Sequence, residues 1–88
     1  MSSEPAWQVS VSFTEDDDRT RADAIVEFGD SRFHGWGRAK RTSGDPNIPV
    51  VGEELAAARA LADLSHQLID AASTRIEEFE HRPVHIPR

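Results

Sequence analysis

The chain of 88 residues contains no cysteine. This absence excludes disulfide bonds, thiolate metal ligands and a thiol nucleophile, and it agrees with a reducing compartment. No apolar run approaches the ~20 residues that a membrane-spanning helix requires, and the opening MSSEPAWQV lacks the charged-then-apolar pattern of a signal peptide. We therefore expect a cytoplasmic protein with no membrane partner, and the chain length predicts a single domain.

Groups of side chains that carry catalysis or bind metals are also missing from the sequence. The acidic pairs at 53–54 and 77–78 are consecutive, so the two carboxylates of each pair point in different directions. His81 and His85 are separated by Pro83, which keeps them from sharing a helical face, and no third ligand stands at metal spacing. The sequence therefore predicts that the protein is not an enzyme and has no catalytic residue, metal site, cofactor or small-molecule ligand.

The longest regular element is the stretch from Gly52 to Phe79, which contains no proline and no glycine after its first residue. Apolar residues recur there at steps of three and four, which places them on one side of an α-helix. Gly52 is the predicted N-cap, and Glu53 and Glu54 suit the positive end of the helix dipole. The apolar side that we expect to be buried comprises Leu55, Ala58, Leu61, Ala62, Leu68, Ile69, Ala72, Ile76 and Phe79.

Three earlier stretches alternate as strands do: Trp7 to Phe13, Thr20 to Phe28 and Arg32 to Ala39. The turn composition at 29–31 makes the second and third strands antiparallel neighbours. After Phe33 the inward residues of the third strand are small, which lets a helix backbone approach the sheet closely. A slip of one residue or a bulge would exchange the two faces. The expected outward residues are Arg21, Asp23, Ile25, Glu27, Arg32, His34, Trp36 and Arg38.

These elements predict an α+β fold in which a three-stranded antiparallel meander is followed by one long C-terminal helix, in the order β-β-β-α. We place this domain at residues 6–81, between a disordered tail at 1–5 and an extended tail at 82–88. Lys40 to Val51 is the expected loop between sheet and helix, since it contains three helix-breaking residues.

The helix is too long for its own sheet. About 27 helical residues span ~40 Å, whereas strands of about 8 residues span ~27 Å. Ile76 and Phe79 would then lack cover, unless the helix bends or breaks near Ser73. A second copy would cover both residues and one of the open sheet edges, so we predict a homodimer with Ile76 and Phe79 at the contact. The alternative is a monomer whose C-terminal tail folds back.

The net charge of −6 argues against nucleic acid as a partner, but the charge is unevenly distributed. The segment from Arg32 to Arg41 carries four basic residues and no acid. Cations beside an aromatic ring suit phosphate contact and base stacking. An ordinary solvated face, or a dimer surface centred on Trp36 and Ile25, remains the alternative. The candidate contacts to RNA or another partner are Arg32, Trp36, Arg38, Lys40 and Arg41.

Several segments resemble the small actinobacterial domain-of-unknown-function family 1876. The most specific is Pro49 to Leu64, within the run PVVGEELAAARALADL. Ser43-Gly44 stand where that family usually has Asn-Pro. The other matching positions are Trp7, Val9, Gly35-Trp36-Gly37-Arg38-Ala39 and Asp45.

The resemblance implies a fold like the double-stranded-RNA-binding domain without its first helix, and it implies dimers. It supplies no catalytic residues. One mycobacterial relative belongs to the hypoxia and dormancy response and has been likened to ribosome hibernation factors. We therefore predict a small non-enzymatic stress- or dormancy-associated protein that binds the ribosome or structured RNA. The alternative is a dimeric protein–protein interaction module that binds no nucleic acid.

Overall fold

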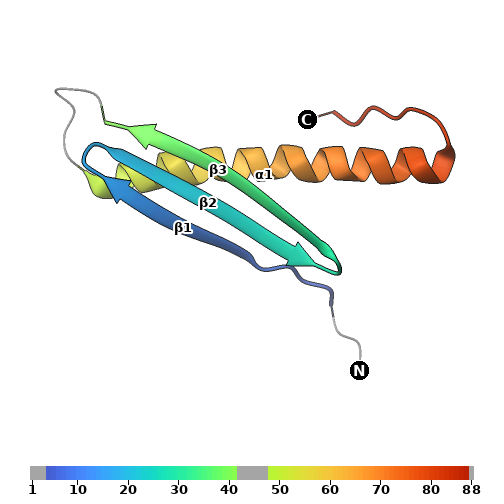
Figure 1. Ribbon diagram of the computed structural model, residues 1–88, viewed down its shortest axis with the longest axis horizontal. Coiled ribbons are helices and arrows are strands. Elements are labelled where there is room, and N and C mark those ends of the chain that lie inside the picture. Colours follow the sequence, from blue (N-terminus) through green and yellow to red (C-terminus); the bar gives the residue numbers. More distant parts are fainter. Residues whose placement is uncertain (1–3, 42–47, 88) are drawn as a thin grey trace.

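The computed structural model describes residues 4–41 and 48–87, and it has the predicted β-β-β-α order (Figure 1). Three antiparallel strands form one sheet in the order β1-β2-β3, and the helix crosses one of its faces. Predictions for residues 1–3 of the N-terminal tail, 42–47 of the loop and 88 lie outside the described residues. The elements are β1 (Val9–Asp16), β2 (Arg19–Phe28), β3 (Ser31–Lys40) and α1 (Pro49–Glu80).

The strand register gives the sheet the two faces that the alternation predicted. Val9 pairs with Val26 across β1 and β2, and Ala24 pairs with Gly35 across β2 and β3, all on the helix side. No slip or bulge exchanges the faces, since the pairing is continuous from Arg19 to Phe28. Two-residue turns join the strands, and each contains a residue with positive φ, Asp17 at 47° and Gly29 at 57°.

The helix backbone rests directly on the glycines of β3, as their small size predicted. A Cβ atom at Gly35 would lie 2.5 Å from the carbonyl oxygen of Ala60, and one at Gly37 would lie 2.5 Å from the Ala60 nitrogen. Real side chains cannot approach backbone atoms so closely, so glycine is required at both positions. The buried core is correspondingly small, and it consists of Ala22, Ala24, Val26, Ala39, Ala56, Ala60 and Leu64.

The buried side of α1 differs from the predicted one. Ala56, Ala60 and Leu64, one turn apart, are the buried residues of α1. Residues of the predicted stripe lie largely in solvent, among them Leu61 at 43% exposure and Phe79 at 84%. The alanines are buried because α1 lies so close to the glycines of β3 that a leucine side chain does not fit between helix and sheet. Leu64, near the end of the contact with these glycines, is the exception.

Both ends of α1 also differ from the prediction. The helix begins at Pro49, with Ile48 as N-cap, so Gly52 is not the cap and no acid lies in the first turn. Proline is compatible with the first helical position because the amide there has no helical partner. The helix ends at Glu80, and His81 adopts the left-handed conformation while its N–H donates to the Glu77 carbonyl.

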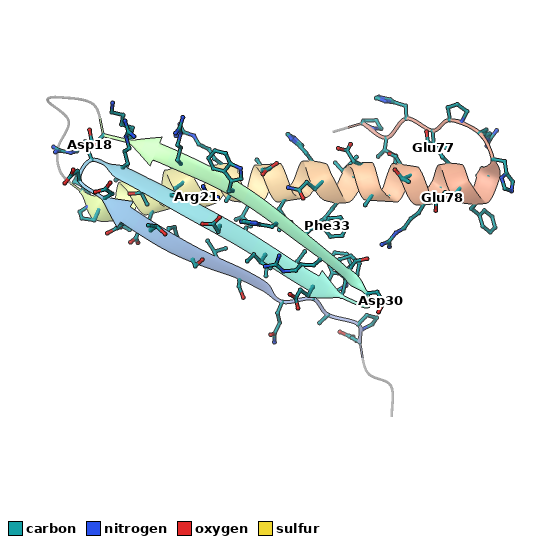
Figure 2. The ribbon with its side chains drawn as sticks, viewed as in Figure 1. Asp18, Arg21, Asp30, Phe33, Glu77 and Glu78 are labelled. Carbon is teal, nitrogen blue, oxygen red and sulfur yellow. The ribbon has the colours of Figure 1, made fainter. Side chains whose placement is uncertain are left out.

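The helix is continuous past Ser73, so the suggested break is absent. Its 32 residues span ~48 Å against ~33 Å for strands of ten residues, and it projects well beyond the β2–β3 turn (Figure 1). After Glu80 the chain turns back along the helix, where the Val84 N–H donates to Glu77 Oε1 at 3.1 Å. Figure 2 shows Glu77 on the side of the helix that faces this returning tail.

The helix packs against β3 and β2 and leaves β1 at the margin. Val9 and Phe13 face the helix side of the sheet, yet both are exposed. Val9 and one side of α1 border a groove of about 430 Å³. The groove is lined by Val9, Leu61, Leu64, Ser65, Leu68, Ile69, Ala72 and Ile86.

Candidate nucleic-acid interface

Four basic side chains meet on the outer face of the sheet, where β2 begins and β3 ends. Arg19 lies directly opposite Lys40, and Arg21 lies directly opposite Arg38. Facing side chains in an antiparallel pair have Cβ atoms ~5 Å apart, so like charges in these positions repel one another. We call Arg19, Arg21, Arg38 and Lys40 the cationic end. Figure 2 shows nitrogen-bearing side chains gathered where β3 ends, with Arg21 beside them on β2.

Little within the described residues neutralises the cationic end. Arg21 forms an ion pair with Asp23, with 3.0 Å between Nη2 and Oδ1. Among the described residues, Arg19, Arg38 and Lys40 form no ion pair, although Asp16 lies opposite Arg19 in the register. Three cations therefore remain available to an anion that arrives from solvent.

The middle of the outer face has a different chemistry. The guanidinium of Arg21 lies 4.6 Å from the ring centroid of Trp36, which is 45% exposed. Asp23 accepts hydrogen bonds from Arg21 and from His34 Nε2, the latter at 2.7 Å. The Arg21 bond first, and the His34 bond second, hold the pKa of Asp23 below its usual value. We call Arg21, Asp23 and His34 the clasp.

The far end of the outer face is neutral. Arg32 lies opposite Glu27, and its Nε donates to Glu27 Oε1 at 3.1 Å. Both side chains are exposed, so this is a solvated ion pair of small energetic value.

The structure therefore distributes the predicted contact residues over three regions. Arg38 and Lys40 lie at the cationic end, Trp36 lies in the middle and Arg32 lies at the far end. Arg41 directly follows β3, and its N–H donates to the Asp18 carbonyl at 2.7 Å. Arg19 was not among the predicted residues, although a two-residue turn at 29–30 would have placed it opposite Lys40.

Side chains of α1 hold the outer edge of β3 in place. Asp63 Oδ2 accepts from the Trp36 N–H at 3.0 Å. Arg59 and Gln67 donate to the carbonyl oxygens of Arg38 and His34, at 2.8 and 2.7 Å. Steps of four helical residues (~6 Å) nearly match steps of two strand residues (~6.7 Å), which is why the three contacts stay in register. The strand that carries Trp36 and Arg38 is thus fixed along its backbone.

The predicted dimer contacts lie on the projecting end of α1. Ile76 and Phe79 are both exposed, Phe79 more than any other large apolar residue described. Across the molecule, at the start of α1, a second hollow of about 310 Å³ adjoins the β1–β2 turn. Beside it the carboxyls of Glu15 and Glu53 share a hydrogen bond, which raises the pKa of Glu53. No helix among the described residues combines the length and apolarity needed to cross a membrane.

Comparisons with known proteins agree with the fold. Uncharacterized protein Rv2632c of Mycobacterium tuberculosis (strain H37Rv) is 40% identical over 77 residues, which cover 88% of this chain and 83% of that protein. Uncharacterized protein MT1780 of M. tuberculosis (strain CDC 1551) is 34% identical over 80 residues, covering 91% and 85%. The crystal structure of Rv2632c matches with a TM-score of 0.83 at 36% identity, over 93% of this chain and 98% of that one.

The family model described as Rv2632c-like matches residues 5–85, which is nearly the whole chain. The expectation of a small family with mycobacterial members and no assigned activity is thereby confirmed. This chain belongs to the Rv2632c-like family.

Proposed function

We propose that this chain is a small non-enzymatic protein that binds structured RNA, including ribosomal RNA, through the cationic end of its outer sheet face. The observation that carries the proposal is the pair of adjacent like-charged positions, Arg19 opposite Lys40 and Arg21 opposite Arg38. Such pairs destabilise a sheet, and of these four side chains only Arg21 has an ion-pair partner among the described residues, Asp23. A polyanion would neutralise them, since phosphates in a nucleic-acid backbone recur at the spacing of neighbouring side chains.

The overall charge does not oppose this role. Although the chain carries −6 in total, the outer positions of β3 between Arg32 and Lys40 include no acid. The β-β-β-α order also resembles that of the double-stranded-RNA-binding domain without its first helix, which makes duplex RNA the natural first probe. Fold alone does not define function. A role in stress or dormancy, in the cytoplasm, is part of the proposal and comes from the family resemblance.

The experiment is a titration of a blunt RNA hairpin, and of purified ribosomes, across a salt series. Contact with three or four phosphates gives a slope of log affinity against log salt of about −3, by analogy with duplex DNA. We expect the double variant R38A/K40A to lose at least tenfold in affinity and to flatten the slope by about two. The matched control is R75A/R82A, which removes the same charge away from the outer face.

Absence of binding at 50 mM salt would overturn the proposal. So would equal losses from R38A/K40A and R75A/R82A, because the effect would then follow net charge and not the position of the cations.

A second proposal concerns oligomeric state. We propose that a second copy covers the apolar surface formed by β1, the groove beside α1 and the projecting helix end. Val9, Leu61 and Phe79 mark its extent, and all three are exposed. The free edge of β1 adjoins the same surface, so one symmetric contact would cover both. An exposed apolar patch of this kind is typical of an interaction site.

Sedimentation equilibrium tests the dimer. We expect a dimer at micromolar concentration and a monomer for the double variant I76D/F79D. A wild-type monomer at that concentration would contradict it. A dimer that fails to bind RNA would favour the alternative function, a protein–protein interaction module.

A further inference from the structure

The middle of the outer face, around Trp36, suggests what kind of RNA the cationic end would hold. Trp36 lies two residues before Arg38 on the same face of β3, a distance of ~6.7 Å along the strand. It is a large apolar ring kept in solvent at 45% exposure, and its backbone is fixed by Asp63. A rigid, exposed indole beside a group of cations is the arrangement that stacks a nucleobase while the backbone phosphates are held next to it.

The middle of the outer face and the cationic end differ in charge. Asp23 lies directly opposite Trp36 and neutralises Arg21, so the surface around the indole carries no net positive charge to hold a phosphate. Arg38 and Lys40, which have no ion-pair partner among residues 4–41 and 48–87, lie on one side only. Phosphates are therefore directed to the cationic end, and the aromatic middle is left for an uncharged group. The guanidinium plane of Arg21 adds a second stacking surface there.

The neighbouring strand leaves room for that group. The outer face of β1 beside the clasp carries only short side chains, since Ser10 lies opposite Ile25 and Ser12 lies opposite Asp23. Nothing large rises from β1 to fill the space over the row Ser12, Asp23 and Trp36. A flat ring that approaches from this direction meets the Arg21 guanidinium, which lies over the indole, so stacking on Trp36 itself uses the other face of the indole.

Paired bases inside a duplex cannot use such a platform, because both of their faces are already stacked. We propose that the ligand of this face is RNA with an unpaired nucleotide next to a helix, the base stacked on Trp36 and the adjoining phosphates held by Arg38 and Lys40. This inference rests on the proposed RNA binding and specifies its substrate class. A blunt duplex would engage only the cationic end.

Three RNA probes test the inference. They are a blunt hairpin, the same hairpin with a three-nucleotide 3′ extension, and the same extended hairpin with abasic sites in the extension. We expect the extension to tighten binding about tenfold and the abasic extension to give no gain, because stacking on one aromatic ring contributes about that much. Trp36→Ala should remove the tenfold gain and leave the affinity for the blunt hairpin unchanged, and Trp36→Phe should keep part of the gain.

Fluorescence gives a readout that folding defects do not imitate. The chain has two tryptophans, and Trp7 stacks on Phe28 at 3.8 Å, a contact that Trp7→Phe preserves. In the Trp7→Phe protein all indole emission comes from Trp36. The extended hairpin should quench it, and the blunt and abasic hairpins should not.

The outcomes separate the two proposals. Salt-dependent binding of all three probes with equal affinity overturns the inference and leaves the proposed function standing. No binding of any probe overturns both. Tighter binding of the extended hairpin that survives Trp36→Ala, with unchanged emission, also overturns the inference, and Trp36 then belongs to a protein contact.

Discussion

The two edge strands of the sheet, β3 and β1, have very different surroundings. Along β3, three helix side chains form hydrogen bonds with the backbone, and two glycines bring α1 into direct contact with the sheet. Along β1, the inward residues Val9 and Phe13 are exposed, and among the described residues α1 bonds to this strand only where the Glu53 carboxyl shares a hydrogen bond with that of Glu15.

This difference follows from where the sheet lacks side chains. The helix settles over Gly35 and Gly37 because only there can its backbone come close enough for alanines to be buried. Having moved to the β3 side, it cannot also cover β1. The result is one rigid edge, which supports the outer-face residues, and one bare edge suited to a partner. Four tests of this contrast follow, beginning with the largest expected effect.

The glycine contact is the strongest test. Gly35→Ala places a Cβ 2.5 Å from helix backbone atoms that cannot move independently, so α1 must shift away from the sheet. We expect a loss of about 3 kcal/mol in the free energy of unfolding, at the upper end of what overpacking costs. Urea denaturation measures it. Ser10→Ala on β1 is the control and should change stability by less than about 0.5 kcal/mol. A Gly35→Ala protein as stable as the wild type would contradict the close contact.

Two leucines that are one turn apart on α1 and differ in burial give the next test. Leu64 is 3% exposed over β3, whereas Leu61 is 43% exposed beside the groove. We expect Leu64→Ala to lower the free energy of unfolding by about 2–3 kcal/mol and Leu61→Ala to lower it by less than about 1 kcal/mol. The measurement is urea denaturation at two protein concentrations. A loss for Leu61→Ala that grows with concentration would belong to the contact with a second copy. Equal losses in dilute protein would show that the buried side is wrongly assigned.

The side-chain bonds to the β3 edge give a smaller effect. Asp63→Ala removes the acceptor for the Trp36 N–H. Because the bond is partly solvated, we expect a loss of about 1 kcal/mol. Hydrogen exchange of the Trp36 amide should accelerate about fivefold or more, which is that free energy expressed as a rate ratio. Asp63→Asn keeps an acceptor oxygen and should retain most of the protection. Unchanged exchange in Asp63→Ala would mean that water replaces the carboxylate at no cost.

Much of this contrast could be predicted from the sequence, because the alternation of side chains along a strand indicates directly which residues share a face. The alternation fixed which residues of β2 and β3 point outward, and the small inward residues of β3 pointed to a close helix. The pairing of Arg32 with Glu27 was also accessible, since the two-residue turn at Gly29 sets the register.

Which side of α1 faces the sheet could not be predicted from the sequence in the same way. Leu55 and Leu61 lie in an apolar row at helical spacing, and Ala56, Ala60 and Leu64 lie in another. Hydrophobicity favours burial of the leucines, and only the close contact with the glycines of the sheet favours burial of the alanines. Considering α1 and β3 together would have identified the alanines as the buried residues. The start at Pro49 was missed for a related reason, since proline interrupts a helix but is well accommodated at its first position.

The clasp gives the smallest expected effect. It joins β2 to β3 through side chains, whereas β1 places only the short side chains of Ser12 and Thr14 opposite Asp23 and Arg21. The folded state lowers the pKa of Asp23, so its ionised form stabilises the fold above the unfolded pKa near 4. That contribution is lost as the pH falls through the lower folded pKa. We expect Asp23→Asn to lower the urea midpoint slightly at pH 7, with the two midpoints converging towards pH 2. Ser12→Ala, on the β1 side of the same row, should leave the pH dependence unchanged. A constant difference between wild type and Asp23→Asn from pH 7 to pH 2 would mean that the charge of Asp23 contributes nothing to stability, and that only its shape matters.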